Sequence, residues 1–188
     1  LAVKYKLKIN RTCEVNTAFT FWFKTTKQNF TKQTNTSDVI LNAYNDTLST
    51  GYRLSLNYSP GTTAGSAITS SINFKINDQL ASFEIPELDK EQWYGVVINH
   101  MNEFKQVSLH IREMQYNPKQ PSVNKTTQLR LIYTKNSDII AEDVIVDDTY
   151  ELRAGTYGLT NFRIFSESIE EEKQPLILNQ YVVRESHL

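Results

Sequence analysis

The chain has 188 residues, of which 39% are hydrophobic and 22% charged, and its formal net charge at pH 7 is -1. This length suits one domain with a core of its own. The near-zero charge gives no basic surface for nucleic acid or an anionic membrane, and no apolar run reaches the roughly 20 residues that cross a bilayer. A single cysteine, Cys13, excludes an internal disulfide. We therefore expect one globular domain, with neither nucleic acid nor a membrane as its partner.

Alternation of apolar and polar residues is the dominant pattern in chain order. In the first run, residues 3–9 (VKYKLKI), four apolar side chains share one face and three lysines share the other. A row of lysines is typical of a strand at a sheet edge, where it discourages pairing with another chain. Similar runs follow at residues 18–25, 51–59, 71–76, 107–113, 128–133 and 157–165. Such runs predict strands with one buried face and one wetter face.

Residues 91–100 (EQWYGVVINH) form the most apolar run, which we interpret as a central strand covered on both faces. We predict that Trp93 at its head is a buried packing residue. Alternation also places four phenylalanines in the core: Phe19, Phe21, Phe23 and Phe74. Trp22 and Tyr94 fall on the opposite faces of their strands. They are the predicted candidates for contact with a ligand or a partner protein.

Polar segments rich in Asn, Gly, Pro and Thr separate the predicted strands, chiefly at residues 25–38, 59–67 and 115–127. They favour turns and exposed loops. Helix is favoured only near the C-terminus, where Ser168 and Glu171 have the spacing of a capping box. The whole pattern predicts an antiparallel β-sandwich over residues 1–166. A short helical turn and tail at 167–188 should pack on the sandwich or on a neighbour.

The order of these motifs resembles a known family. The motifs are FTFWFKT (19–25), DVILNA (38–43), GYRLSL (51–56), INFKIND (72–78), EQWYGVVIN (91–99), VSLHIREM (107–114) and GLTNFRIFSESIEEEKQ (158–174). Together they are similar to laminin-G-like, concanavalin A-like jelly-roll domains over nearly the whole chain. Residues 157–188 also resemble the C-terminal side of such domains in virion structural proteins of large tailed bacteriophages. The resemblance implies an all-β antiparallel jelly roll, located in a virion, with other protein subunits as its partners.

Three acids imitate a catalytic pattern. Glu87, Asp89 and Glu91 match the Glu-x-Asp-x-Glu strand of laminarinase-type glucanases, which share the jelly-roll fold. Retaining hydrolysis needs two carboxyl groups about 5–5.5 Å apart, which alternate positions on one strand can supply. In the glucanase pattern apolar residues anchor this strand, whereas here Lys90 holds one anchor position and Pro86 precedes the motif. We therefore interpret the acids as a solvated turn and predict no catalysis.

Neither the histidines nor the aspartates mark a metal site. His100, His110 and His187 have no second ligand at metal-binding spacing, so we predict polar surface histidines. Laminin-G-like domains often hold calcium at the sandwich rim through aspartates and backbone carbonyls. Four aspartates fall in predicted loops, namely Asp46, Asp78, Asp147 and Asp148. No spacing distinguishes them from ordinary turn residues, so we predict no cofactor, with calcium as the alternative.

From these features we predict a non-catalytic structural or interaction module, namely a bacteriophage virion structural protein. The alternative is a carbohydrate-binding, lectin-like module of a surface or secreted protein that binds glycans, and the third reading is a β-glucanase-like enzyme. The near-zero charge suits a subunit packed among others. Apolar residues of the tail should cover the sandwich or dock on a neighbour: Leu176, Ile177, Leu178, Val182 and Val183.

Overall fold

The computed structural model describes residues 2–6, 9–11, 16–24, 36–59, 69–86, 88, 92–114, 129–146, 149–153 and 158–185. The strands are β1 (Ala2–Lys6), β2 (Ile9–Arg11), β3 (Thr17–Lys24), β4 (Thr36–Asn45), β5 (Thr50–Ser59), β6 (Thr69–Ile76), β7 (Gln79–Ile85), β8 (Trp93–Met101), β9 (Gln106–Met114), β10 (Leu129–Asp138), β11 (Val144–Val146), β12 (Thr149–Arg153) and β13 (Gly158–Phe165). A 3-10 turn, η2 (Glu171–Lys173), leads into the helix α2 (Gln174–Glu185). No helix in these ranges has the length and apolar character needed to cross a membrane.

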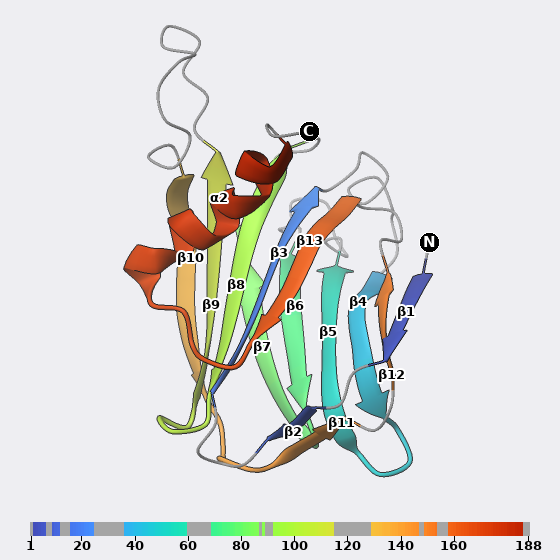
Figure 1. Ribbon diagram of the computed structural model, residues 1–188. Helices are drawn as coiled ribbons and strands as arrows, with labels where there is room; N and C mark the ends of the chain where they lie inside the picture. Colours follow the sequence, from blue (N-terminus) through green and yellow to red (C-terminus); the bar gives the residue numbers. More distant parts are fainter. Residues whose placement is uncertain are drawn as a thin grey trace, which may run out of the picture.

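Two antiparallel sheets face each other as the layers of a sandwich (Figure 1). One is six-stranded in the order β1-β12-β4-β5-β6-β7, and the other is five-stranded in the order β10-β9-β8-β3-β13. A small third sheet pairs β11 with β2 across one end of the sandwich. The predicted antiparallel sandwich is confirmed. The first predicted strand, residues 3–9, is divided between two sheets. Its first part is β1, the outermost strand of the six-stranded sheet, as predicted, whereas Ile9 belongs to β2 of the third sheet.

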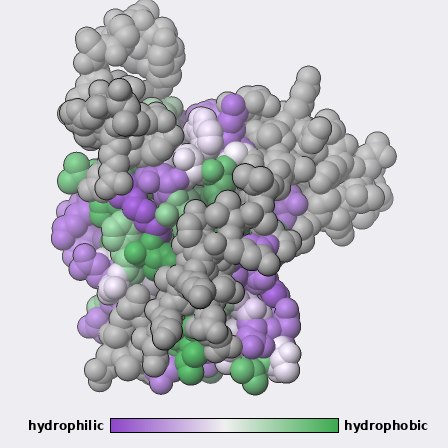
Figure 2. Space-filling model, turned by 45° about the vertical axis from the view of Figure 1, so that its right-hand side comes forward, coloured by the Kyte–Doolittle hydropathy of each residue, from purple (hydrophilic) through white to green (hydrophobic). Residues whose placement is uncertain are grey.

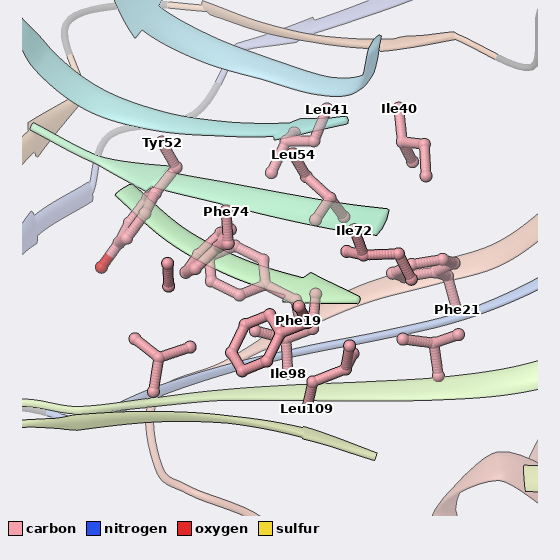
Figure 3. Close-up of a cluster of buried hydrophobic side chains, with 14 of the residues drawn as sticks. Phe19, Phe21, Ile40, Leu41, Tyr52, Leu54, Ile72, Phe74, Ile98 and Leu109 are labelled. Carbon is pink, nitrogen blue, oxygen red and sulfur yellow. The ribbon is translucent and has the colours of Figure 1, made fainter. Parts of the chain in front are cut away.

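The core between the sheets is built from alternate residues of the facing strands. Phe19 lies at its centre, with its ring centroid 5.1 Å from that of Tyr52 and 5.3 Å from that of Phe74. Aliphatic side chains from both sheets surround these rings (Figure 3). The four phenylalanines predicted for the core are all buried there. Edge-to-face aromatic contacts of this kind add to the stabilisation from burial.

The outer face of the five-stranded sheet is covered by the C-terminal segment (Figure 1). Side chains of the sheet form hydrogen bonds with that segment: Trp22 Nε1 donates to the Leu178 carbonyl at 3.0 Å, and Asn99 exchanges two bonds with the backbone of Ile169. Leu178 packs in a second apolar cluster with Trp22. The helix comes so close that a Cβ on Gly95 would lie 2.9 Å from Leu178 Cδ1. The segment is therefore part of the folded sandwich, not an appendage.

The start of this segment differs from the sequence prediction. The first helical turn begins at Glu171 with Glu170 as its N-cap, and no side-chain hydrogen bond caps it. The predicted capping box from Ser168 is therefore wrong, because the chain at 168 is still crossing the sheet to dock Ile169. The side chains of Val182 and Val183 lie outside the described part of the chain.

Candidate functional site

Trp93, at the start of β8, is the most exposed aromatic side chain on the outer face of the five-stranded sheet. Its exposed fraction is 36%, so the prediction that it is buried is wrong. The strand register pairs Trp93 with Lys24 on β3, and Lys24 with Gly158 on β13. A Cβ on Gly158 would lie 2.9 Å from Trp93 Cη2 and 3.5 Å from Cζ2. The indole therefore extends across β3 and lies against the bare backbone of Gly158.

The burial of Trp93 was predicted wrongly because the sequence pattern of β8 does not show which alternate residues point into the core. Residues 94–100 are all buried, so both faces of this strand are covered and the hydropathy pattern does not fix which residues point inward. Tyr94 points into the core, with its ring centroid 5.9 Å from that of Phe23. Trp93 consequently points outward. Residue 158 is glycine, which leaves room for the indole to lie on the sheet.

The two aromatics predicted to contact a ligand are both buried. Trp22 is on the outer face, as the pattern predicted, but the C-terminal helix covers it and it is 4% exposed. Tyr94 is on the inner face and 1% exposed. Neither side chain offers a surface to a ligand in this structure. Among the described residues on the outer face of this sheet, the exposed aromatic is instead Trp93.

Polar side chains gather at the same end of the five-stranded sheet as Trp93. Glu113 on β9 lies opposite Tyr94, the next residue after Trp93. Its carboxylate accepts an ion-paired hydrogen bond from Arg130 on β10, and Gln92 Nε2 lies 3.5 Å from Glu113 Oε2. Arg130 has a side chain more than half exposed. Opposite residues of an antiparallel pair share a face, and Tyr94 points inward, so Glu113 and Arg130 lie on the inner side of this end of the sheet. Trp93 lies on the other, outer face.

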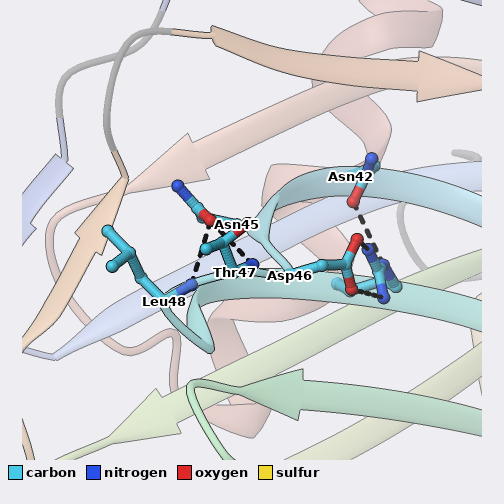
Figure 4. A network of polar contacts seen from close by, with 6 residues as sticks. Asn42, Asn45, Asp46, Thr47 and Leu48 are labelled. Carbon is cyan, nitrogen blue, oxygen red and sulfur yellow. Dashed lines mark hydrogen bonds and ion pairs between the residues drawn. The ribbon is translucent and has the colours of Figure 1, made fainter.

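A second polar network lies on the outer face of the six-stranded sheet (Figure 4). Arg53 donates to Asn42 Oδ1 at 3.1 Å and to both oxygens of Asp46, at 3.2 and 2.9 Å. The hydrogen bond from Arg53 is the largest influence that lowers the pKa of the Asp46 carboxyl. The Arg53 guanidinium and the Lys75 ammonium each lie 4.7 Å from the ring centroid of Tyr44. This aromatic ring already has cationic partners, whereas Trp93 keeps part of its surface open to solvent.

The predicted surface histidines are buried. His100 is fully buried, with Nδ1 2.8 Å from the Tyr52 hydroxyl, because even-numbered residues of β8 point inward. Burial lowers its pKa to about 4, against the smaller opposing effect of a hydrogen bond that the imidazole donates to the Asn102 side chain. His110 is on the predicted outer face but lies beneath the C-terminal segment, 3.0 Å from Thr134 Oγ1. Burial likewise lowers its pKa. The prediction of polar surface histidines is therefore wrong for both.

Most of the remaining candidates lie outside the described part of the chain, and those within it form no further site. Seven residues named in the sequence analysis lie outside the described part of the chain: Glu87, Asp89, Lys90, Glu91, Asp147, Asp148 and His187. Asp46 is engaged by Arg53, and Asp78 is exposed in the turn between β6 and β7. In the ranges that the structure describes, no group of three or more His, Cys, Asp or Glu residues could hold a metal ion. Calcium binding stays a prediction from the sequence.

No protein-family model and no curated protein matches this sequence. Solved structures match it in shape. The receptor-binding domain of botulinum neurotoxin mosaic serotype C/D matches with a TM-score of 0.59 at 14% identity, covering 97% of this chain and 47% of that one. The heptameric SAP-like pentraxin from Limulus polyphemus matches with a TM-score of 0.56 at 9% identity, covering 94% of this chain and 75% of that one.

A variant of human galectin-16 is more distant, with a TM-score of 0.42 at 9% identity over 86% of this chain and 94% of that one. At such identities a likeness shows the fold alone. The fold is the concanavalin A-like jelly roll that the order of the sequence motifs predicted. The chain spans about half the length of the botulinum domain that it matches.

Proposed function

We propose that this chain is a non-catalytic carbohydrate-binding module in which Trp93 is the platform for a sugar ring. The observation that carries the proposal is the partly covered indole, which lies across β3 against Gly158, while 36% of the residue surface is exposed. A pyranose has an apolar C–H face that can pack on an aromatic ring. Its hydroxyl groups can exchange hydrogen bonds with polar side chains on the same face, such as that of Lys24, the strand partner of Trp93.

The platform is already in place before a ligand arrives. Trp93 is the first residue of a strand that is paired on both sides, and its indole has only two side-chain torsions. Contact with Gly158 restricts these torsions further. Binding therefore costs little additional side-chain order, which favours affinity.

The expected strength of this contact follows from the exposed area. A tryptophan can bury up to about 250 Å², and the 36% that is exposed here corresponds to about 90 Å². At about 25 cal/mol per Å², covering this area contributes about 2 kcal/mol, or roughly 30-fold in Kd. That is sufficient for one subsite of a glycan-binding surface.

This proposal replaces the structural-subunit reading as the first choice. A carbohydrate-binding module would meet its ligands, glycans, on cell surfaces or in secretions. We accordingly propose an extracellular or cell-surface location. The resemblance to phage virion proteins stays a prediction from the sequence, and the structures reported above are not phage proteins.

The experiment is a glycan array probed with the wild-type chain, followed by calorimetric titration of the best ligand. Trp93→Ala should weaken binding about 30-fold. Gly158→Ala should also weaken it, because the added Cβ displaces the indole while the aromatic ring remains. Tyr44→Ala is the matched control, since it removes an aromatic from the other sheet and should leave Kd unchanged. Circular dichroism melting confirms that each variant folds.

Two results would count against the proposal. One is a wild-type chain that binds no glycan on the array. The other is a ligand that Trp93→Ala binds as tightly as wild type does.

A further inference from the structure

The end of the sandwich opposite Trp93 has an unusual surface, which we call the turn end. It comprises the β4–β5 turn (46–49), the β6–β7 turn (77–78), the β8–β9 turn (102–105) and the segment 138–146, which includes β11. Antiparallel pairing brings these turns to the same end, at the bottom of Figure 1. β11 lies against β5 and β4 there.

Large apolar side chains are exposed at the turn end. Of the seven large hydrophobic residues that are exposed in the described ranges, four lie here: Leu48, Phe104, Ile140 and Ile145. Their exposed fractions run from 49% to 74%. Turns normally carry small or polar residues at such positions. Green apolar surface is visible at the lower end of the molecule in Figure 2. Single exposed apolar residues need no explanation, but a group on adjoining turns indicates an interaction surface.

The backbone under these side chains is held by hydrogen bonds from both sheets. Gln79 donates to the Ile140 carbonyl at 2.8 Å and accepts from the Ile140 amide at 2.7 Å. Asn102 donates to the Glu142 carbonyl, and Asn77 donates to the Asp143 carbonyl.

Two more contacts complete this arrangement. The Ile139 amide donates to the Lys105 carbonyl, which joins the segment to the turn that carries Phe104. Asn45 Oδ1 accepts hydrogen bonds from the amides of Thr47 and Leu48 (Figure 4). The exposed apolar side chains are thus presented on a fixed backbone, as a preorganised binding surface requires.

The charges around these apolar residues are predominantly negative. In the β6–β7 and β8–β9 turns and in residues 138–143, the described carboxylates are Asp78, Glu103, Asp138, Glu142 and Asp143. The same stretches contain one cation, Lys105. The whole chain has a net charge of only -1, so the negative charge here is a local feature.

We propose that the turn end docks a protein partner that presents apolar residues within a basic surface. The core of the interface, from which water is excluded, would be formed by Phe104, Ile140 and their apolar neighbours. The carboxylates would form its rim and pair with the basic groups of the partner. The negative leaflet surface of a membrane would repel this rim. A second copy docking by the same end would bring like charges together. Charge therefore favours a basic protein over both.

The turn end and the Trp93 platform can be occupied together. β8 runs from Trp93 to Met101, so eight steps of about 3.3 Å separate them by roughly 26 Å. The docking proposal does not depend on glycan binding. If both hold, the chain links a glycan to a basic protein.

The test uses a library of random 12-residue peptides, selected on the immobilised wild-type chain. Peptides that also bind the double variant Phe104→Ser/Ile140→Ser are removed by counter-selection. The enriched peptides should combine Lys or Arg with large apolar residues. Synthetic versions should bind the double variant at least 10-fold more weakly than wild type.

Two further variants separate charge from general surface effects. The triple variant Asp78→Asn/Glu103→Gln/Asp143→Asn should also weaken binding, and the salt dependence should fall. Leu176→Ser, which removes an equally exposed leucine from α2, should bind as wild type does. All these substitutions are at exposed positions, and melting curves verify folding.

Several outcomes would overturn the docking proposal. The selection could yield no peptide that distinguishes wild type from the double variant, or only neutral or acidic peptides. Sedimentation velocity could show a wild-type dimer that the double variant loses, which would make the occupant a second copy. Flotation with phosphatidylcholine vesicles could show binding lost in the same variant, which would make it a membrane.

Discussion

Acidification should destabilise this protein through His100. The imidazole is fully buried and within hydrogen-bond distance of the Tyr52 hydroxyl, and its pKa falls from 6.5 to about 4 on folding. Below pH 6.5 the unfolded chain therefore binds a proton that the folded chain does not accept. The free energy of unfolding is unaffected by this group above pH 6.5, and it decreases as the pH falls toward 4.

The size of this effect follows from the shift. One pKa unit corresponds to about 1.4 kcal/mol, so the loss between pH 6.5 and 4 is about 3 kcal/mol. The assay is urea denaturation from about pH 7.5 to about pH 4, comparing wild type with His100→Asn. Asparagine keeps a polar group near the position of Nδ1 and does not titrate. Because the other titrating groups are common to both proteins, the difference between the two curves isolates His100.

The variant should be less stable than wild type at about pH 7.5, with the gap narrowing by about 3 kcal/mol toward pH 4. If the two free-energy curves stay parallel across this range, the buried neutral histidine described here is refuted.

Three further predictions concern the C-terminal segment and the acidic motif. Gly95→Ala should destabilise the fold by about 1–3 kcal/mol in urea, because its Cβ would lie 2.9 Å from Leu178 Cδ1. Trp22→Phe should cost about 1–3 kcal/mol in the same assay, since the Leu178 carbonyl loses its indole donor. Glu87→Gln with Glu91→Gln should leave glycan affinity unchanged, and wild type should release no reducing sugar from laminarin; turnover that these variants abolish would establish a glucanase instead.

Local patterns predicted most of the fold. Clean alternation, as in Phe19, Phe21 and Phe23, fixes which face of a strand is buried. Alternation does not show which residues of β8 point inward, because both faces of this strand are covered. The hairpin that joins β8 to β9 does show it. Its four-residue turn places Val107 opposite His100, and opposite residues of an antiparallel pair share a face. Since Val107 is an inward residue of a clearly alternating strand, His100 must point inward and Trp93 outward.

The covered outer face could not be predicted in this way. Asn99, His110 and Arg112 have the polarity of solvent-facing residues. They are buried because a segment about 60–70 residues further along the chain covers them, and its backbone carbonyls accept hydrogen bonds from Asn99 and Arg112. His110 bonds instead to side chains of its own sheet, those of Ser108 and Thr134. The contact of Trp93 with Gly158 likewise joins residues from distant strands. Neither contact can be predicted from the residues that lie next to it in the sequence.

Iodide quenching of tryptophan fluorescence, with and without a glycan identified on the array, tests directly whether Trp93 binds the sugar. The chain has two tryptophans, one exposed and one 4% exposed beneath the helix. Without ligand, iodide should quench the emission of Trp93 and spare that of Trp22. Saturating glycan should remove the quenchable fraction, because the sugar covers the indole. A glycan that binds at saturation while iodide quenching stays unchanged would place the site elsewhere and contradict the account.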